Sequence, residues 1–254
     1  MDTQKLVAAW RAKLNGQTSK EVGQQKIHEA CLWIYRWGFS TPSIIDSLSG
    51  AKSRGFSARL VSKGLLKSTL CPSYGGVKHA PAKVLTLTRS GIEVVEARAD
   101  SKIVPYHDAI PFHQIVHDVL VQTITLEKIK TQQIKYFTAR ENRESRNQPG
   151  QKIPDAVWLI KGDIYAFELE LSAKRSRELD TTCAGLINLV TNQNINGIII
   201  YSPSDAIINR YKESLKIGNK IDFWKRQGTR WVTESTITVP DAFLGKIIFK
   251  KIEL

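Results

Sequence analysis

Three acidic residues are spaced so that two neighbouring strands would bring them together. Asp155 follows a proline at the start of an apolar run, and Glu168 and Glu170 lie two apart in the next run. Lys161-Gly162-Asp163 separates the two runs with residues typical of a hairpin turn. Because side chains alternate along a strand, Glu168 and Glu170 are expected on one face, with Asp155 beside them on the hairpin partner.

Carboxylates held this close favour either protonation or the binding of a cation. Ionised groups ~4 Å apart repel by roughly 4 kcal/mol per pair at an effective dielectric of about 20. Oxygen ligands alone suit Mg²⁺ or Mn²⁺. The alternative is that Glu168 and Glu170 line the solvated face of an antiparallel strand. Against it, Tyr165, Phe167 and Leu169 make the other face apolar, and residues 186–190 are expected to form a helix that covers the acidic face.

The pattern Pro154-Asp155 followed by Glu168-Leu169-Glu170 resembles the signature of the PD-(D/E)xK nucleases, in the variant where glutamate replaces the motif lysine. The flanking residues predict that fold's αβββαβ core. The expected elements are a helix at 112–130, strands at 134–141, 153–160 and 164–171, a helix at 173–191 and a strand at 195–201. By this resemblance Asp155 and Glu168 would bind Mg or Mn, and Glu170 would be a further ligand or the base.

Lys174 is the candidate for the missing lysine. Residues 172–177 are predicted to begin a helix with three cations in its first turns, which opposes the helix dipole unless an anion lies nearby. Lys174 lies four positions after Glu170 and would reach back to the carboxylates to offset charge on a phosphate. The alternative is a surface helix on which Lys174 and Arg177 pair with Glu178 or Asp180.

The composition indicates an anionic partner. The 254 residues carry a formal net charge of +13, and residues 1–103 hold 16 Lys and Arg against 7 Asp and Glu. We expect no membrane association, because no long apolar run or signal peptide is recognised. Three widely spaced cysteines predict neither disulfides nor a zinc site, and the expected location is the cytoplasm.

The first hundred residues are similar to a winged helix-turn-helix. Three short helices are predicted from residue 19 to about Lys63, followed by Gly64-Leu65-Leu66, a hairpin, and Leu87-Thr88-Arg89-Ser90-Gly91 at the start of a fourth helix. In the third helix Ser57 is expected to face outward with the basic residues, while Phe56 and Leu60 pack inward. The predicted DNA contacts are Arg54, Arg59, Lys63 and Lys78. A solvated helix face and a protein-binding winged helix are the alternatives.

Two further features complete the chain. His113 and His117 lie four apart on a predicted helix, which is compatible with a metal site, and His117 is the better candidate for a site residue; packing or capping is the other interpretation. Phe223, Trp224 and Trp231 are interpreted as core or edge packing. The later strands 230–239 and 246–253 are expected to extend the sheet.

Together these features resemble the replication-relaxation family, in particular MobC-type plasmid mobilisation relaxases. The resemblance implies an α+β or α/β fold with an N-terminal arm (1–18), a winged-helix DNA-binding domain (19–98), a linker (99–111) and a nuclease-like domain (112–254). It implies metal-dependent nicking (nickase, endonuclease activity) of double-stranded plasmid DNA at a transfer origin during conjugation. An accessory relaxosome protein and a coupling protein are the implied partners.

Two other functions remain open from the sequence. One is a non-catalytic plasmid replication or copy-control protein, whose nuclease-like domain only dimerises or holds DNA. The other is a different PD-(D/E)xK endonuclease, such as a resolvase or restriction enzyme.

Overall fold

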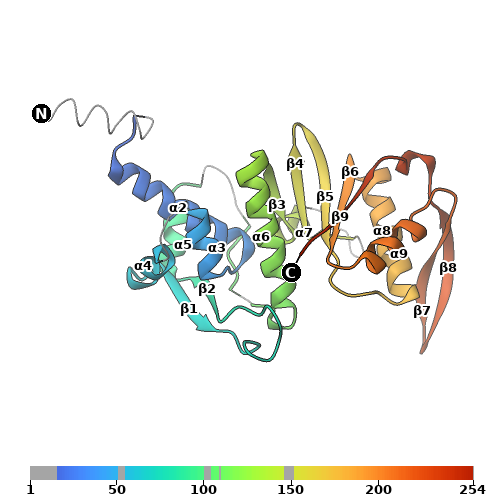
Figure 1. Ribbon diagram of the computed structural model, residues 1–254, viewed down its shortest axis with the longest axis horizontal. Coiled ribbons are helices and arrows are strands. Elements are labelled where there is room, and N and C mark those ends of the chain that lie inside the picture. Colours follow the sequence, from blue (N-terminus) through green and yellow to red (C-terminus); the bar gives the residue numbers. More distant parts are fainter. Residues whose placement is uncertain (1–15, 51–54, 100–103, 109, 146–151, 254) are drawn as a thin grey trace, which may run out of the picture. The chain divides into compact units, whose positions relative to one another are not determined.

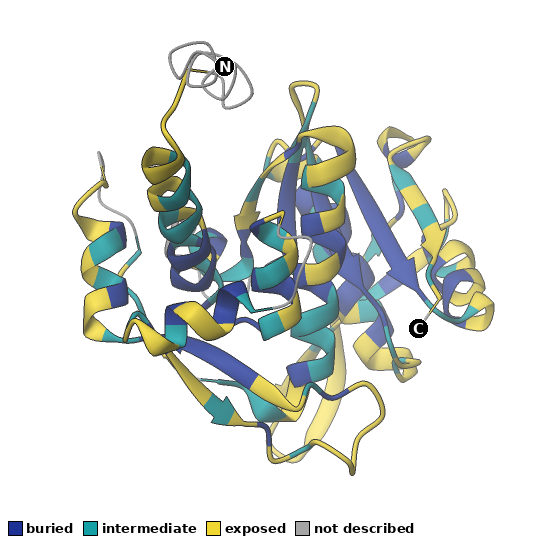
Figure 2. Ribbon diagram, turned by 60° about the vertical axis from the view of Figure 1, so that its left-hand side comes forward, coloured by how far each residue is buried: buried dark blue, intermediate teal, exposed yellow. Residues whose placement is uncertain are grey.

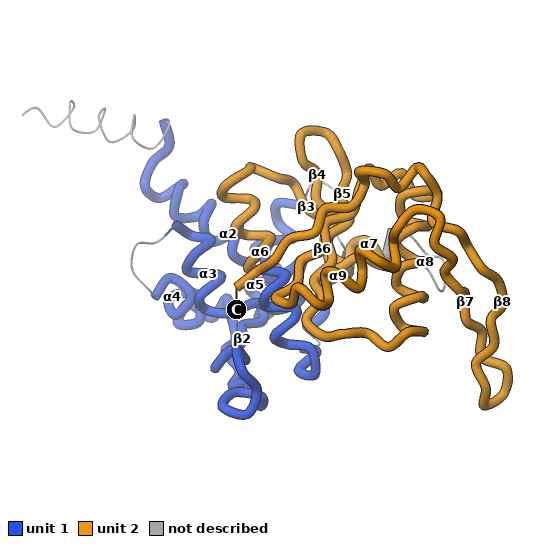
Figure 3. The backbone as a smooth tube through the Cα atoms, turned by 45° about the vertical axis from the view of Figure 1, so that its right-hand side comes forward, with its two compact units in different colours: residues 1–122 blue, residues 123–254 orange. Residues whose placement is uncertain are grey.

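The computed structural model describes residues 16–50, 55–99, 104–108, 110–145 and 152–253. The chain divides into two compact units, residues 1–122 and residues 123–254, which Figure 3 shows in different colours. Arg54 and most of the N-terminal arm lie outside the described residues. None of the helices in the described ranges is long and apolar enough to cross a bilayer.

The first unit contains a cluster of helices and a two-stranded hairpin (Figure 1). Its elements are α2 (Ser19–Trp37), α3 (Pro42–Leu48), α4 (Phe56–Ser62), β1 (Leu66–Leu70), β2 (Lys83–Leu87), α5 (Arg89–Glu96), η1 (Phe112–Gln114) and the first turns of α6 (Ile115–Gln132). Strands β1 and β2 pair antiparallel, and Ser40 adds a single bridge to Leu85.

Local capping explains where these helices begin. Thr18 and Thr41 accept backbone hydrogen bonds at the starts of α2 and α3. Helix α4 has glycine at its cap, and the Asp46 carboxylate from α3 accepts from Ser57 N at 2.7 Å instead. Because this contact draws Ser57 inward, Ser57 is buried, and the prediction that it faces outward is wrong.

Gly91, the glycine of the Leu-Thr-Arg-Ser-Gly sequence, is required for steric reasons. Thr88 caps α5 by accepting from Gly91 N at 3.2 Å, and its hydroxyl donates to Gly64 O at 2.6 Å. A Cβ on Gly91 would lie 2.2 Å from the carbonyl oxygen of Leu65. The helix therefore packs against the hairpin strand too closely for any side chain at this position.

The division between the units falls inside α6, whereas the sequence predicts a linker at 99–111. The first turns of α6 belong to the N-terminal unit because Ile115 packs with Phe39 and Val84. Gln122 also joins α6 to the N-terminal unit, because it accepts hydrogen bonds from Trp33 Nε1 at 3.0 Å and Ser40 Oγ at 2.8 Å.

The second unit is built on a mixed five-stranded sheet in the order β3-β4-β5-β6-β9. Its elements are β3 (Lys135–Thr138), α7 (Ala139–Ser145), β4 (Ala156–Ile160), β5 (Asp163–Leu169), α8 (Ser176–Asn192), β6 (Gly197–Ser202), α9 (Asp205–Ser214), β7 (Lys220–Gln227), β8 (Arg230–Thr238), η2 (Asp241–Phe243) and β9 (Ile247–Lys251). Strands β3, β4 and β5 are antiparallel, and β5, β6 and β9 are parallel.

The two faces of β5 pack against different helices, and the predicted cover of the acidic face by the helix that contains residues 186–190 is confirmed. Ala166 belongs to a core with Leu186 and Ile187 of α8 and Tyr211 of α9. On the other face Phe167 stacks on Trp158 with ring centres 4.2 Å apart, and Trp158 Nε1 donates to Thr125 of α6 at 3.3 Å. Figure 2 shows the central strands as buried between these layers.

Two expected elements differ from the structure. The strand expected at 134–141 ends at Thr138, where Thr138 and Glu141 cap each other's backbone N–H groups and begin α7. Strand β8 does not extend the sheet; it pairs with β7 in a separate two-stranded ribbon, and only β9 joins the sheet edge.

Candidate active site

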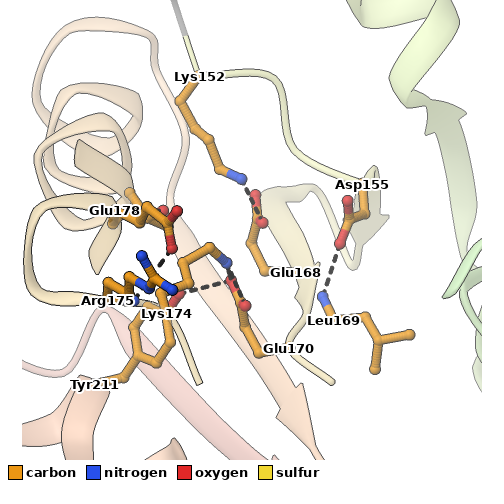
Figure 4. Close-up of polar contacts among 10 residues, drawn as sticks. Lys152, Asp155, Glu168, Leu169, Glu170, Lys174, Arg175, Glu178 and Tyr211 are labelled. Atoms are coloured by element: carbon orange, nitrogen blue, oxygen red, sulfur yellow. Dashed lines mark hydrogen bonds and ion pairs between the residues drawn. The ribbon is translucent and has the colours of Figure 1, made fainter. Parts of the chain in front are cut away.

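The predicted hairpin forms and brings the three acids to one end of it. Lys161 and Gly162 both have positive φ, as a two-residue hairpin turn requires, and Ile160 pairs with Asp163. The register pairs Ala156 with Phe167, so Asp155 comes just before the strand pair, opposite Glu168. Asp155 Oδ2 accepts from Leu169 N at 2.8 Å, which fixes this carboxylate beside the end of β5 (Figure 4).

Glu168 and Glu170 are buried, 2% and 4% exposed. The alternative that they line a solvated strand face is therefore wrong. They lie on the face of β5 that α8 covers, where an unpaired carboxylate would be costly. Each instead contacts a lysine.

Lys152 donates to Glu168 Oε2 at 2.6 Å. The other oxygen of this carboxylate, Oε1, is buried and accepts no hydrogen bond within the described ranges. The stem of Lys152 passes over Gly185 of α8, where an added Cβ would lie 2.5 Å from Lys152 Cβ. Gly185 therefore leaves the space through which Lys152 reaches Glu168.

Lys174 donates to both oxygens of Glu170, and Tyr211 donates to Glu170 Oε1 at 2.7 Å (Figure 4). The expectation that Lys174 reaches back to the carboxylates is confirmed for Glu170. The predicted helix start is wrong, because α8 begins only at Ser176, where Glu178 accepts from Arg175 N at 3.2 Å. Lys174 thus precedes the helix, and its carboxylate partner is Glu170.

We call Asp155, Glu168, Glu170, Lys152 and Lys174 the carboxylate–lysine cluster. Burial raises the pKa of Glu168 to about 8, with Asp155 and Glu170 adding to the rise and Lys152 opposing it. Burial opposes the charge on Lys152, but the Glu168 and Asp155 carboxylates outweigh it and raise the Lys152 pKa.

The cluster provides two carboxylates, rather than three, for a cation. Asp155 and the unpartnered Oε1 of Glu168 are oxygen ligands of the kind Mg²⁺ and Mn²⁺ prefer. Glu170 fits less well because Lys174 and Tyr211 occupy its oxygens. Within the described ranges, no three His, Cys, Asp or Glu residues gather as a group of metal ligands.

The remaining predicted residues lie in the N-terminal unit. His117 Nδ1 is 3.0 Å from Asp118 Oδ1 on α6, while Glu168 belongs to the second unit. Arg59, Lys63 and Lys78 are exposed, and Arg54 lies outside the described residues. Arg59 and Lys63 line a cavity of about 220 Å³ with Lys26 of α2, over an apolar floor that includes Phe56.

Sequence reasoning missed Lys152 and Tyr211 as members of this site. Lys152 lies three residues before Asp155, and the only sequence signal is a cation next to a predicted acidic strand. Tyr211 comes from α9, and nothing in its local pattern relates it to Glu170.

Comparison with family models, curated proteins and solved structures found no match.

Proposed function

We propose that this protein is a metal-dependent DNA-nicking enzyme of the relaxase type, acting in the cytoplasm on double-stranded plasmid DNA at a transfer origin. The observation that carries the proposal is the buried Glu168 carboxylate, which has one oxygen on Lys152 and the other without a partner among the described residues, beside Asp155. An accessory relaxosome protein and a coupling protein are the proposed partners.

The order of elements supports this proposal. Helices α2, α3 and α4, the β1–β2 hairpin and α5 follow the order expected of a winged helix. Helix α6 and then β3, β4, β5, α8 and β6 follow the αβββαβ order of the PD-(D/E)xK fold, with the short helix α7 inserted between β3 and β4. Asp155 comes just before β4 and Glu168 lies on β5, the hairpin where that motif carries its acids. The proposed fold is therefore a winged helix joined to a nuclease-like domain.

Asp155 and Glu168 would hold the proposed Mg²⁺ or Mn²⁺. Such ions are commonly bound by one or two carboxylates together with substrate phosphate, so two acids suffice. When bound, the ion would supply charge stabilisation at the scissile phosphate and lower the pKa of a water molecule. In this proposal Glu170 is a positioning residue for Lys174, and not a ligand.

The lysines have separate roles. Lys152 keeps the buried Glu168 oriented through the 2.6 Å contact. Lys174 is held by Glu170 at the start of the segment that leads into α8, and its side chain is partly exposed. A cation there can offset charge that develops on a phosphate.

The competing proposal is a non-catalytic DNA-binding protein for plasmid replication or copy control. It is favoured by the two lysines, which already contact Glu168 and Glu170 without a metal. Another endonuclease of the same fold would share the carboxylate–lysine cluster but recognise a different DNA site.

Incubation with supercoiled plasmid separates these functions. The purified protein is mixed with plasmids that carry or lack the transfer origin, in Mn²⁺, Mg²⁺ or EDTA. We expect open-circular product only with metal and with the origin. Origin-independent cleavage would indicate another endonuclease, and binding without cleavage in either metal would indicate the non-catalytic protein.

A further inference from the structure

The β7–β8 ribbon is an exposed two-stranded arm of the second unit. Its strands pair antiparallel from Lys220↔Thr238 to Gln227↔Arg230, and Gly228 with positive φ forms the turn. A two-stranded ribbon has little stability alone, so its contacts with α8 matter. Trp224 Nε1 donates to Asp180 Oδ2 at 3.0 Å, and Figures 1 and 3 show the ribbon beside α8.

One end of the ribbon belongs to the core and the other end does not. Ile221 is buried and Ile237 packs on the same core. Beyond the irregularity between Phe223 and Trp224, nearly every residue is exposed. The interpretation of these aromatic residues as core or edge packing therefore holds for Trp224 and is wrong for Phe223 and Trp231, which are 37% and 44% exposed.

An arginine from α8 covers part of the exposed tryptophan. The Arg177 guanidinium lies over the indole ring of Trp231, 4.4 Å from the ring centre. Arg226 is the strand partner of Trp231, and paired residues project from the same face of a ribbon. Arg177 and Arg226 therefore place positive charge on the face of the ribbon that carries the indole. Phe223, 37% exposed, projects from the opposite face because it lies three residues before Arg226 in the same strand.

The acids of the ribbon do not neutralise these cations. Glu234 pairs with Lys225 at 3.0 Å, and Asp222 accepts from Thr236 at 2.7 Å. Arg226 and Arg230 are exposed, and neither has an acidic partner in the described part of the chain. The distal half of the ribbon thus combines an exposed indole with net positive charge.

We propose that Arg177, Arg226 and Trp231 form a binding surface for single-stranded DNA. Exposed aromatic rings stack on unpaired bases, and flanking arginines contact the phosphates. Duplex DNA keeps its base faces stacked and offers no such contact to the indole. Docking of a second copy would place the same cations against one another, which opposes it. The inference rests on the proposed function in taking DNA as the anionic partner.

Fluorescence anisotropy tests this surface with the full chain and a labelled oligothymidylate strand, in EDTA so that no cleavage occurs. Trp231→Ala should weaken binding about tenfold or more, the range found for loss of one stacked base, and Trp231→Phe should retain most affinity. Arg226→Ala should reduce the salt dependence of log K by about 0.7. Phe137→Ala and Arg210→Ala, which remove an exposed ring and an exposed cation elsewhere, should change neither.

The measured affinity for single-stranded DNA does not depend on whether the protein nicks plasmid DNA. If the plasmid assay shows no cleavage but Trp231→Ala selectively weakens strand binding, the surface stands and the proposed function fails. Unchanged strand affinity in Trp231→Ala overturns the inference, whatever the cleavage result. Equal losses on a matched duplex, or a change of oligomeric mass in Trp231→Ala, would also overturn it, by indicating a duplex contact or a surface between copies.

Discussion

Lys152 Nζ lies 2.6 Å from Oε2 of Glu168, and the stem of that lysine occupies the space left by a glycine on the neighbouring helix. Three segments therefore meet at this contact: Lys152 before strand β4, Glu168 on β5 and Gly185 on α8. The charge, the position and the proton affinity of Glu168 can each be tested through it.

Gly185→Ala should displace Lys152 without removing any charge. The new methyl group would lie 2.5 Å from Lys152 Cβ, too close to be relieved by rotation of the side-chain end. We expect nicking to fall towards the level of Lys152→Ala, on the order of 10²-fold, while DNA affinity is kept. Gly23→Ala on α2 has no atom within 4 Å of the added Cβ and is the matched control. Equal rates in wild type and Gly185→Ala would contradict this role for Lys152.

Glu168→Gln should flatten the dependence of stability on pH. The folded-state pKa of Glu168 is about 8 against an ordinary value of 4.5, so the folded protein binds this proton more tightly than the unfolded chain. The corresponding stability is present below pH 4.5 and is lost as pH rises towards 8, with an upper limit of about 5 kcal/mol. Urea unfolding followed across this range should show a smaller loss in Glu168→Gln. Parallel curves would mean that the Glu168 pKa is not raised.

Binding of Mn²⁺ should release a proton at neutral pH. Because Glu168 holds a proton below about pH 8, the cation must displace it, and affinity should rise by up to roughly tenfold per pH unit until pH exceeds that value. Calorimetry in buffers of different ionisation enthalpy measures the released proton directly. Glu168→Gln should bind weakly and without this pH dependence. If wild-type affinity is constant from pH 6 to pH 8.5, the metal is bound elsewhere.

Lys174→Ala should slow single-turnover nicking by roughly 10²-fold, while Arg175→Ala has a far smaller effect. The two variants should differ because Lys174 is part of the carboxylate–lysine cluster, where it donates to both oxygens of Glu170. Arg175 is exposed at the start of α8. Affinity for the same DNA, measured by anisotropy, should be similar in both variants. Small and equal rate changes would identify Lys174 as only a structural partner of Glu170.

Arg59→Ala should weaken duplex DNA binding through the N-terminal unit. Loss of a base contact would cost ~1 to 3 kcal/mol, and loss of a phosphate contact would lower the salt slope by about 0.9. Lys20→Ala, an exposed cation at the start of α2, is the control. Titration at several salt concentrations distinguishes the two kinds of contact, and identical curves for wild type and Arg59→Ala would exclude this residue from the interface.

Much of the second unit was predictable because its signals are local. The period-two alternation around Glu168 and the turn at Gly162 determine the hairpin, its faces and the position of Asp155. The cap formed by Thr138 and Glu141 was also present in the sequence, but the apolar run before it favoured a longer strand.

Other parts of the site depend on contacts between distant segments. Lys152 reaches Glu168 only because Gly185 lacks a side chain, and Tyr211 reaches Glu170 across the core from α9. The exposure of Trp231 follows from the pairing of β8 with β7 rather than with the sheet. The residue pattern of a single strand or helix does not predict these contacts between distant segments.

The separation of cleavage from binding tests the proposed function most directly. Wild type, Asp155→Ala and Glu168→Gln are each saturated with supercoiled origin plasmid in Mn²⁺, and the single-turnover rate of nicking is measured beside the affinity for the same DNA in EDTA. We predict that both variants bind like wild type and lose nicking by at least about 10²-fold, because each loses a proposed metal ligand and no phosphate contact. Nicking at the wild-type rate in either variant would contradict the assignment of this cluster as the active site.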